Sequence, residues 1–287
     1  MHHSRINVLG VGINALTLDS AVEAVLDAVA ERRQGYVTVT GVHGVSECQQ
    51  DAELRRIHND SLLSTPDGVP LTWMGRLQGK RHHEMQRVYG PDLMLQVFQR
   101  GQSRGLRHYL FGGGEGVAPL LAEKLTARFP AAQIVGHYTP PFRLLTEDEE
   151  QEIVAGLLTL EPHCVWVGLS TPKQERLMAH LLSRHAAELP APLVMLGVGA
   201  AFDFHAGLKP QAPAWMQRAG LEWLYRFQQE PRRLWRRYLK NNPLFVARAA
   251  LQLTGLRKYD LPPHLQETPA SRGVPAPGAG LGDEPAR

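Results

Sequence analysis

The sequence has little cysteine and no long apolar run. Its 287 residues include only two cysteines, Cys48 and Cys164. Two cysteines cannot form a disulfide scaffold or a cysteine-rich zinc site, so a reducing compartment is the simpler setting. The longest lipid-like stretch, residues 244–256, contains Arg248 and is shorter than the roughly 18 apolar residues that a spanning helix needs. We therefore expect neither a membrane-spanning helix nor a cleavable signal.

Three common ligand-binding signatures are also missing. No Asp-x-Asp, which holds the divalent ion of many sugar nucleotides, occurs in the chain. The glycine-rich stretch from Gly112 has Val117 where a dinucleotide fingerprint needs its third glycine, and it lacks the Lys-Ser/Thr of a P-loop. These absences argue against a nicotinamide-cofactor site and a P-loop site.

The net charge of +3 conceals an uneven distribution. Residues 218–258 contain ten Lys or Arg and two Glu, which leaves 21 of the 31 basic and 26 of the 28 acidic groups to the rest of the chain. The sequence therefore combines a slightly acidic body with a strongly basic C-terminal segment.

Between residues 6 and 199, short β-rich runs alternate with helical patterns. This order predicts an α/β fold: a Rossmann-like, mostly parallel sheet with helices on both faces, plus a basic helical C-terminal appendage. We expect a body over residues 1–208, the appendage over 209–258 and a disordered Pro/Gly-rich tail over 259–287. In such sheets, ligands bind beyond the carboxyl ends of the strands.

Several local patterns give specific expectations. Residues 6–13 read as a strand or hairpin, and residues 45–58 as one helix. Asp19 is predicted to cap a helix that runs to Glu31, and Thr146 with Glu149 forms a capping box. Thr171 is predicted to cap the helix that follows the buried strand at residues 164–169, and Pro210, Pro213, Pro231 and Pro243 to divide the C-terminal segment into short helices.

Two strand-end segments suggest an anion site and a base. Gly112, Gly113 and Gly114 join a strand to a helix, where backbone N–H groups can approach a phosphate; a merely tight turn is the alternative. Asp67 lies in Thr65-Pro66-Asp67-Gly68 after a short strand. It is either a turn residue or a carboxylate that accepts a proton from a hydroxyl nucleophile. Arg87 is a candidate anion clamp or a surface charge paired with Asp92.

The two later strand ends supply further candidates. Lys173 and Gln174 open a helix, and capping does not explain them, so they are candidates for contacts with a sugar or phosphate. Gly199 permits close approach of a ligand, and Asp203 suits a ribose or base. Asp203 and His205 could instead ligate a metal, but no third ligand accompanies them, so no metal site is expected.

Taken in order, these motifs resemble the WecG/TagA/CpsF glycosyltransferases. The resemblance covers about residues 6–240 and rests on Pro66-Asp67-Gly68, Tyr89-Gly90-Pro91-Asp92-Leu93, Leu110-Phe111-Gly112-Gly113 and the segments 167–175, 197–204, 213–218, 220–226 and 230–234. Each motif is modest by itself, and the ordered set is specific.

This resemblance implies an inverting, metal-independent hexosyltransferase. Its donor would be a UDP-sugar carrying N-acetylmannosamine or its uronic acid, and its acceptor a sugar on polyprenyl diphosphate. Products of the family feed wall teichoic acid, enterobacterial common antigen or exopolysaccharide in the cell envelope. No cofactor is implied, and the expected location is cytoplasmic, peripheral on the inner membrane surface. The oligomeric state stays open, with a homo-oligomer among the options.

The resemblance also implies roles for individual residues. Asp67 would be the general base, and Arg87 and Gln174 would contact the substrates. The loops at Gly112–Gly114 and Gly199–Asp203 would hold the UDP. Arginines of the appendage would close over the site and engage diphosphate: Arg226, Arg233 and Arg236.

The sequence departs from the family's pattern at the end of one strand. The family's usual Thr-x-Asn is absent after Tyr36, and Thr38 and Thr40 are the candidate partners for the donor sugar.

The C-terminal segment also has a spacing of basic residues that would form one stripe on a helix, interleaved with aromatic residues: Arg226, Arg233, Arg237 and Lys240. A stripe of this kind suits either a solvated face or a membrane interface.

Two other function classes fit parts of the sequence. A Rossmann-like oxidoreductase would bind a nicotinamide cofactor, but the fingerprint is missing. A nucleic-acid-binding protein would use the Arg- and aromatic-rich segment, but the acidic body and the strand-end motifs argue against it. Neither a nicotinamide nor a nucleic-acid partner is therefore expected.

Overall fold

The computed structural model describes residues 4–79 and 82–266, and its centre is a parallel sheet of six strands in the order β4-β3-β8-β7-β5-β6. All the pairings between neighbouring strands are parallel. The strands are β3 (Gln34–Thr40), β4 (Leu63–Pro66), β5 (Arg107–Gly112), β6 (Gln133–Tyr138), β7 (Cys164–Gly168) and β8 (Leu193–Gly197). The predicted fold class is confirmed.

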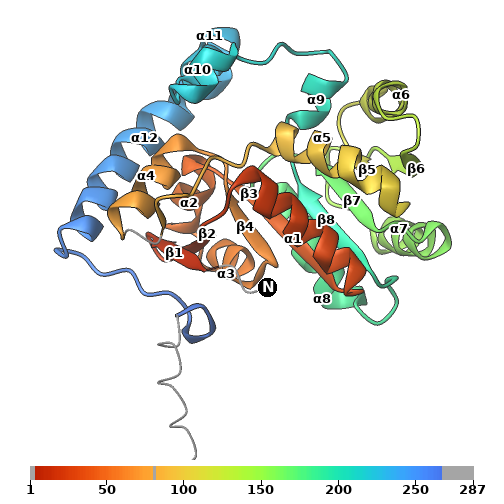
Figure 1. Ribbon diagram of the computed structural model, residues 1–287, viewed down its shortest axis with the longest axis horizontal. Helices are drawn as coiled ribbons and strands as arrows, with labels where there is room; N and C mark the ends of the chain where they lie inside the picture. The colour runs from red at the N-terminus through yellow and green to blue at the C-terminus, as the bar shows by residue number, and fades with distance from the viewer. Residues whose placement is uncertain (1–3, 80–81, 267–287) are drawn as a thin grey trace, which may run out of the picture.

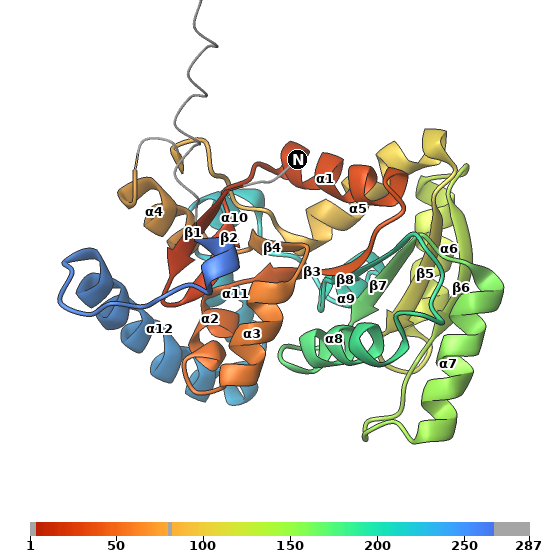
Figure 2. The same ribbon diagram turned by 90° about the horizontal axis from the view of Figure 1, so that it is seen from below.

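Helices cover both faces of this sheet (Figures 1 and 2). On one face, α1 (Leu18–Ala30), α5 (Gly90–Gly101) and α6 (Val117–Arg128) pack in a core that includes Leu110 and Trp166. On the other, α7 (Glu147–Leu160) and α8 (Lys173–His185) pack with Phe111 and Val167. Successive strand residues enter opposite cores because side chains alternate across a sheet.

The N-terminal predictions are partly confirmed. An antiparallel hairpin, β1 (Arg5–Val8) and β2 (Val11–Asn14), forms as predicted. The prediction that Asp19 caps α1 is wrong, because Thr17 accepts the hydrogen bond from the backbone N of Ser20. The single helix predicted for 45–58 is two, α2 (Val42–Cys48) and α3 (Ala52–Asp60), because Asp51 caps a new start.

Of the two capping predictions for α7 and α8, one is confirmed and one is wrong. The capping box of Thr146 and Glu149 is present at α7. The predicted cap at Thr171 is absent: α8 has no side-chain cap, and the Thr171 hydroxyl instead donates to Glu175 Oε1 at 2.9 Å.

The C-terminal segment is helical, as predicted for the appendage. After α9 (Ala201–His205), the last helix of the predicted body, it contains α10 (Ala214–Arg218), α11 (Glu222–Gln229) and α12 (Pro231–Leu253). The break predicted at Pro243 is wrong, because α12 runs through it. Beyond the proline, Phe245 and Ala249 are buried in a core shared with α2 and α4 (Val69–Leu77), and this packing stabilises the helix.

The end of the described chain lies on the N-terminal hairpin. Residues 259–266, which the composition assigned to the tail, lie against it instead: Asn7 Nδ2 donates to the carbonyl of Tyr259, and Leu265 lies beside Gly12. The rest of the predicted tail, residues 267–287, lies outside the described residues. Within residues 4–79 and 82–266, no helix is long and apolar enough to cross a membrane.

Candidate active site

A cleft of about 2340 Å³ lies at the carboxyl ends of the strands. Its lining includes the loops after β3, β4, β5, β7 and β8, residues of α2, α3, α7 and α8, and residues of α4, α11 and α12. Small-molecule sites usually occupy about 300–1,000 Å³, so this cleft has room for more than one substrate. The crevice lies where the sheet topology predicts a ligand site.

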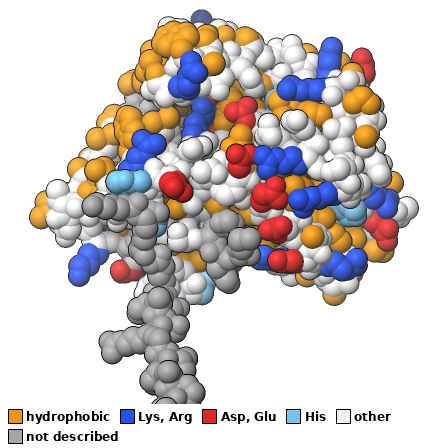
Figure 3. All heavy atoms as spheres, in the orientation of Figure 1, with side chains coloured by type: hydrophobic (Ala, Val, Ile, Leu, Met, Phe, Trp, Pro, Cys, Tyr) orange, Lys and Arg blue, Asp and Glu red, His pale blue; other side chains and the backbone are white. Residues whose placement is uncertain are grey.

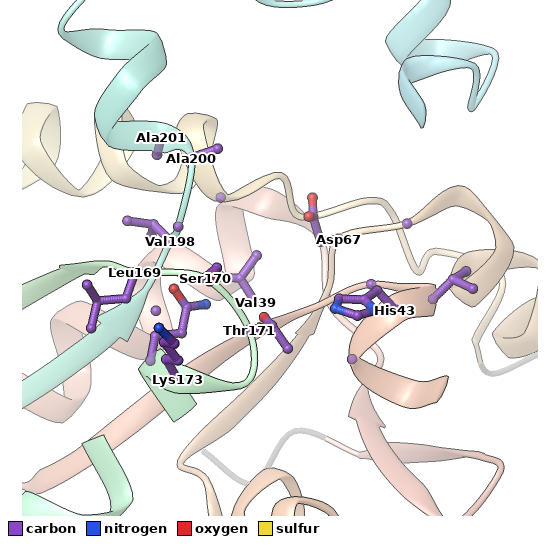
Figure 4. A pocket seen from close by; sticks show the side chains of 18 of the residues that line it. Val39, His43, Asp67, Leu169, Ser170, Thr171, Lys173, Val198, Ala200 and Ala201 are labelled. Atoms are coloured by element: carbon purple, nitrogen blue, oxygen red, sulfur yellow. The ribbon is translucent and has the colours of Figure 1, made fainter. Parts of the chain in front are cut away.

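Asp67 lies at the floor of the cleft, directly after β4. Its backbone N donates to the carbonyl of Thr40 at 2.9 Å. Arg87 Nε donates to the Asp67 carbonyl at 2.8 Å, and Arg87 Nη2 lies 3.4 Å from Asp67 Oδ1. Figure 4 shows the carboxylate pointing into the open space between the Ala200 loop and His43. The backbone contacts and Arg87 thus hold one carboxylate toward the cleft.

Glu222 of α11 joins this pair from the appendage. Its Oε2 accepts a hydrogen bond from Arg87 Nη2 at 2.5 Å. The Arg87 and Glu222 side chains are only 17% and 11% exposed, so the ion pair is largely shielded from water. The alternative pairing of Arg87 with Asp92 is wrong. Sequence reasoning missed Glu222 as a site residue, because it is one of two acids in a basic segment.

The surroundings of Asp67 shift its proton affinity. Burial raises the pKa of Asp67 to about 7, with Glu222 adding to the rise and the positive charges of Arg87 and Arg226 opposing it. A carboxyl group that titrates near neutral pH can both accept and release a proton there. This position therefore suits a general base.

The glycine loop after β5 divides into two roles. Gly113 and Gly114 line the cleft, and the N-terminus of α6 follows at Val117 with no side-chain cap. Gly112 is not among the lining residues. A Cβ there would lie 2.8 Å from backbone atoms of Gly168, so glycine at Gly112 permits the close approach of β5 and β7. Gly113 and Gly114 therefore stay candidates for the contact with UDP. Gly112 instead allows β5 and β7 to pack closely.

Four other predicted residues also line the cleft: Lys173, Gln174, Gly199 and Asp203. Gln174 is 3% exposed, donates to Glu175 Oε1 at 3.1 Å and leaves its Oε1 without a hydrogen-bond partner. A Cβ on Gly199 would lie 3.1 Å from the Leu169 carbonyl oxygen, which accounts for glycine there.

Asp203 and His205 make separate contacts. Asp203 Oδ2 pairs with Lys209 Nζ at 2.9 Å, whereas His205 Nε2 lies 2.9 Å from the Pro91 carbonyl. In the described part of the chain, no group of three His, Cys, Asp or Glu side chains could hold a metal ion.

Thr38 and Thr40 do not reach the cleft. Both are buried at the end of β3, where Thr40 Oγ1 lies 3.2 Å from Thr38 Oγ1, 3.1 Å from His58 Nδ1 and 3.0 Å from Ser64 Oγ. Val39, between them, lines the cleft instead. The assignment of the two threonines as donor-sugar partners is therefore corrected: they form an internal polar cluster.

The basic residues of the appendage are only partly described. Arg226 lines the cleft, and its guanidinium carbon lies 6.0 Å from the Phe204 ring centroid. Arg233, Arg236 and Arg237 lie on α12, but their side chains fall outside the described residues. Their predicted contact with diphosphate stays a prediction.

Comparison with known proteins identifies the family of this chain. The Glycosyl transferase WecG/TagA/CpsF family model matches residues 6–259. A Bacillus subtilis (strain 168) protein named N-acetylglucosaminyldiphosphoundecaprenol N-acetyl-beta-D-mannosaminyltransferase is 28% identical over 191 residues, 66% of this chain and 69% of the relative. A Bacillus spizizenii protein of the same name is 26% identical over 223 residues, 77% and 82% of the two chains. The chain therefore belongs to the WecG/TagA/CpsF family and is a glycosyltransferase.

Proposed function

We propose that this enzyme transfers N-acetylmannosamine, or its uronic acid, from a UDP-sugar to a sugar carried on polyprenyl diphosphate. The names of both relatives describe an N-acetylmannosaminyl donor group and an N-acetylglucosaminyl-diphosphoundecaprenol acceptor. The observation that carries the proposal is Asp67, a carboxyl group with a pKa near 7 at the floor of a cleft large enough for two substrates. The product would serve the synthesis of a cell-surface polysaccharide.

Asp67 acts in the proposed reaction as the general base. Its carboxylate accepts the proton of the acceptor hydroxyl while that oxygen forms a bond to the anomeric carbon of the donor. The bond between this carbon and the UDP oxygen breaks on the opposite side, so the anomeric configuration inverts. Arg87 holds the carboxylate in position through the two contacts described above.

The leaving diphosphate needs positive partners in the cleft. Lys173 and Arg226 line the cleft and supply cationic groups, and Gly114 supplies a backbone N–H group, because the N–H of Gly113 already donates to the Gly168 carbonyl at 3.0 Å. Charge-assisted hydrogen bonds of this kind are the strong ones, and such donors stabilise a developing anion. We propose on this basis that transfer proceeds without a divalent metal ion.

The C-terminal helices supply the proposed contact with the membrane surface. Their exposed aromatic residues include Trp215, Trp223 and Trp235, which are 59%, 42% and 44% exposed. Figure 3 shows hydrophobic side chains gathered at the upper left, where α10–α12 lie, with Lys or Arg among them. Amphipathic helices that combine tryptophan with basic residues favour an anionic membrane interface.

A donor panel tests the proposed function. The full chain is mixed with N-acetylglucosaminyl diphosphate on a polyprenyl chain and with one UDP-sugar at a time, in the presence of EDTA. We expect UDP release and labelled lipid with UDP-N-acetylmannosamine or its uronic acid. Transfer only after a divalent ion is restored would overturn metal independence. Failure of every UDP-sugar under both conditions would overturn the proposed donor class.

A further inference from the structure

The cleft continues beyond the catalytic residues as an apolar groove. Its walls in this part are α4 and α12, which lie on the same flank of the molecule in Figures 1 and 2. The N-terminus of α4 follows Asp67 directly, with Gly68 as its N-cap. Along α12, Asn241 lies near the catalytic end, because its Nδ2 is 3.1 Å from His43 Nδ1. From these points both helices lead away from Asp67.

The groove is lined by apolar side chains that water still reaches. On α4, Trp73 and Leu77 line the cleft and are 56% and 68% exposed. On α12, Val246 and Leu253 line it and are 66% and 41% exposed. The residues on each helix recur at intervals of four or seven, so each helix presents one apolar face. Exposed apolar groups gathered along one groove mark a binding site.

The charged residues of α4 and α12 whose side chains are described do not line this groove. Among the described residues of α4 and α12 that line the cleft, none is charged. Arg76 of α4 and Arg248 of α12 have described side chains and are absent from the lining. The cationic residues that line the cleft lie on other elements, among them Arg87, Lys173 and Arg226 near Asp67. Polarity thus changes along one continuous cleft, from charged at Asp67 to apolar at Leu253.

We propose that the groove between α4 and α12 binds the polyprenyl chain of the acceptor while its diphosphate and sugar lie at the charged end. This assignment rests on the proposed function. The 23 residues of α12 extend about 34 Å at 1.5 Å per residue, so a long chain has room to lie along the helix. Contact with the chain removes apolar surface of both partners from water, which is the source of the affinity.

Two leucines of equal exposure provide the test. Leu77 lines the groove, whereas Leu239 of α12 is not among the lining residues, and each is 68% exposed. Leu77→Ser and Leu239→Ser are made in the full chain. KM is then measured for two acceptors with the same sugar diphosphate, one on a long polyprenyl chain and one on a short alkyl chain, in the same detergent.

We expect Leu77→Ser to raise KM for the long-chain acceptor about tenfold, equivalent to about 1.4 kcal/mol. KM for the short-chain acceptor should change much less, and Leu239→Ser should preserve the preference for the long chain. An equal rise for both acceptors, no rise, or the same rise in Leu239→Ser would overturn the groove assignment.

A vesicle measurement separates chain binding from bilayer docking. Flotation with vesicles of anionic phospholipid that lack the acceptor should be similar for Leu77→Ser and Leu239→Ser. A loss of flotation confined to Leu77→Ser would make the groove a bilayer contact and overturn the proposal. If the unchanged chain used neither acceptor with any UDP-sugar, the proposed function itself would fail, a result distinct from equal use of both acceptors.

Discussion

The two walls of the cleft are built in different ways. The sheet wall consists of loops after β5, β7 and β8, and it offers glycine backbone, Lys173 and Gln174. The helical wall consists of α4 and the appendage, and it offers charged side chains and apolar helix faces. One wall comes from short-range sequence features at strand ends. The other depends on Glu222 meeting Arg87 across 135 positions of the chain.

This difference assigns the two substrates to the two walls. Backbone groups and small residues on the sheet wall suit a nucleotide diphosphate, which needs close approach and N–H donors. The helical wall holds the carboxylate and the apolar groove, which suit a hydroxyl nucleophile on a lipid. Asp67 lies where the walls meet, so changes at this point should affect the reaction most.

The largest expected effect is that of Asp67→Asn. The amide cannot accept the acceptor proton, so kcat should fall about 10³-fold, within the usual range for a general base. Calorimetric titration should show unchanged UDP affinity, because UDP is assigned to the other wall. Asp92→Asn, an exposed acid in the first turn of α5, is the control and should retain activity. Near-normal turnover in Asp67→Asn would refute the assignment of the base.

Arg87→Ala should have the next largest effect. Arg87 lowers the pKa of Asp67, so its removal leaves this pKa higher and the base mostly protonated at pH 7. We expect kcat/KM at pH 7 to fall about 100-fold and to recover partly as the pH is raised. Arg104→Ala, which removes only a surface pair with Glu23, serves as the control. A loss independent of pH would contradict an effect through Asp67.

Gly113→Ala tests the sheet wall by itself. Gly113 has a φ of 76°, and a Cβ there would lie 2.9 Å from Val117 Cβ, so alanine must displace the loop. KM for the UDP-sugar should rise about tenfold, equivalent to about 1.4 kcal/mol, and KM for the acceptor should stay the same. A larger change for the acceptor than for the donor would reverse the assignment of the walls.

The matched control for Gly113→Ala is Gly156→Ala. Gly156 lies inside α7, where a Cβ would meet nothing within 4 Å. Alanine there should raise the free energy of unfolding by about 0.5–1 kcal/mol without changing kinetics. Thermal unfolding of both variants checks this contrast.

The sequence predicted the sheet wall better than the helical wall. Gly113 directly follows β5, and Gly199 and Gln174 come soon after β8 and β7, positions that share one edge in a parallel sheet. Thr38 and Thr40 were misassigned because both are buried at the end of an interior strand, where Thr40 Oγ1 lies within hydrogen-bond distance of His58 and Ser64. The sequence does not show this internal polar cluster, because His58 and Ser64 reach it only through the fold. Glu222 lies in the family-like segment 220–226, but its role was missed because its partner Arg87 is brought to it only by the packing of the appendage.

The pH dependence of kcat/KM, compared between the unchanged chain and Glu222→Gln, tests most directly the claim that the walls meet at Asp67. The base must be deprotonated, so activity should rise with pH through about 7 in the unchanged chain. Glu222 raises the pKa of Asp67, so neutralising Glu222 should move the rise in kcat/KM to a pH about one unit lower. Glu230→Gln, the other acid of the basic segment, should leave the rise in place. If kcat/KM of Glu222→Gln rose at the same pH as in the unchanged chain, or at a higher pH, this claim would be contradicted.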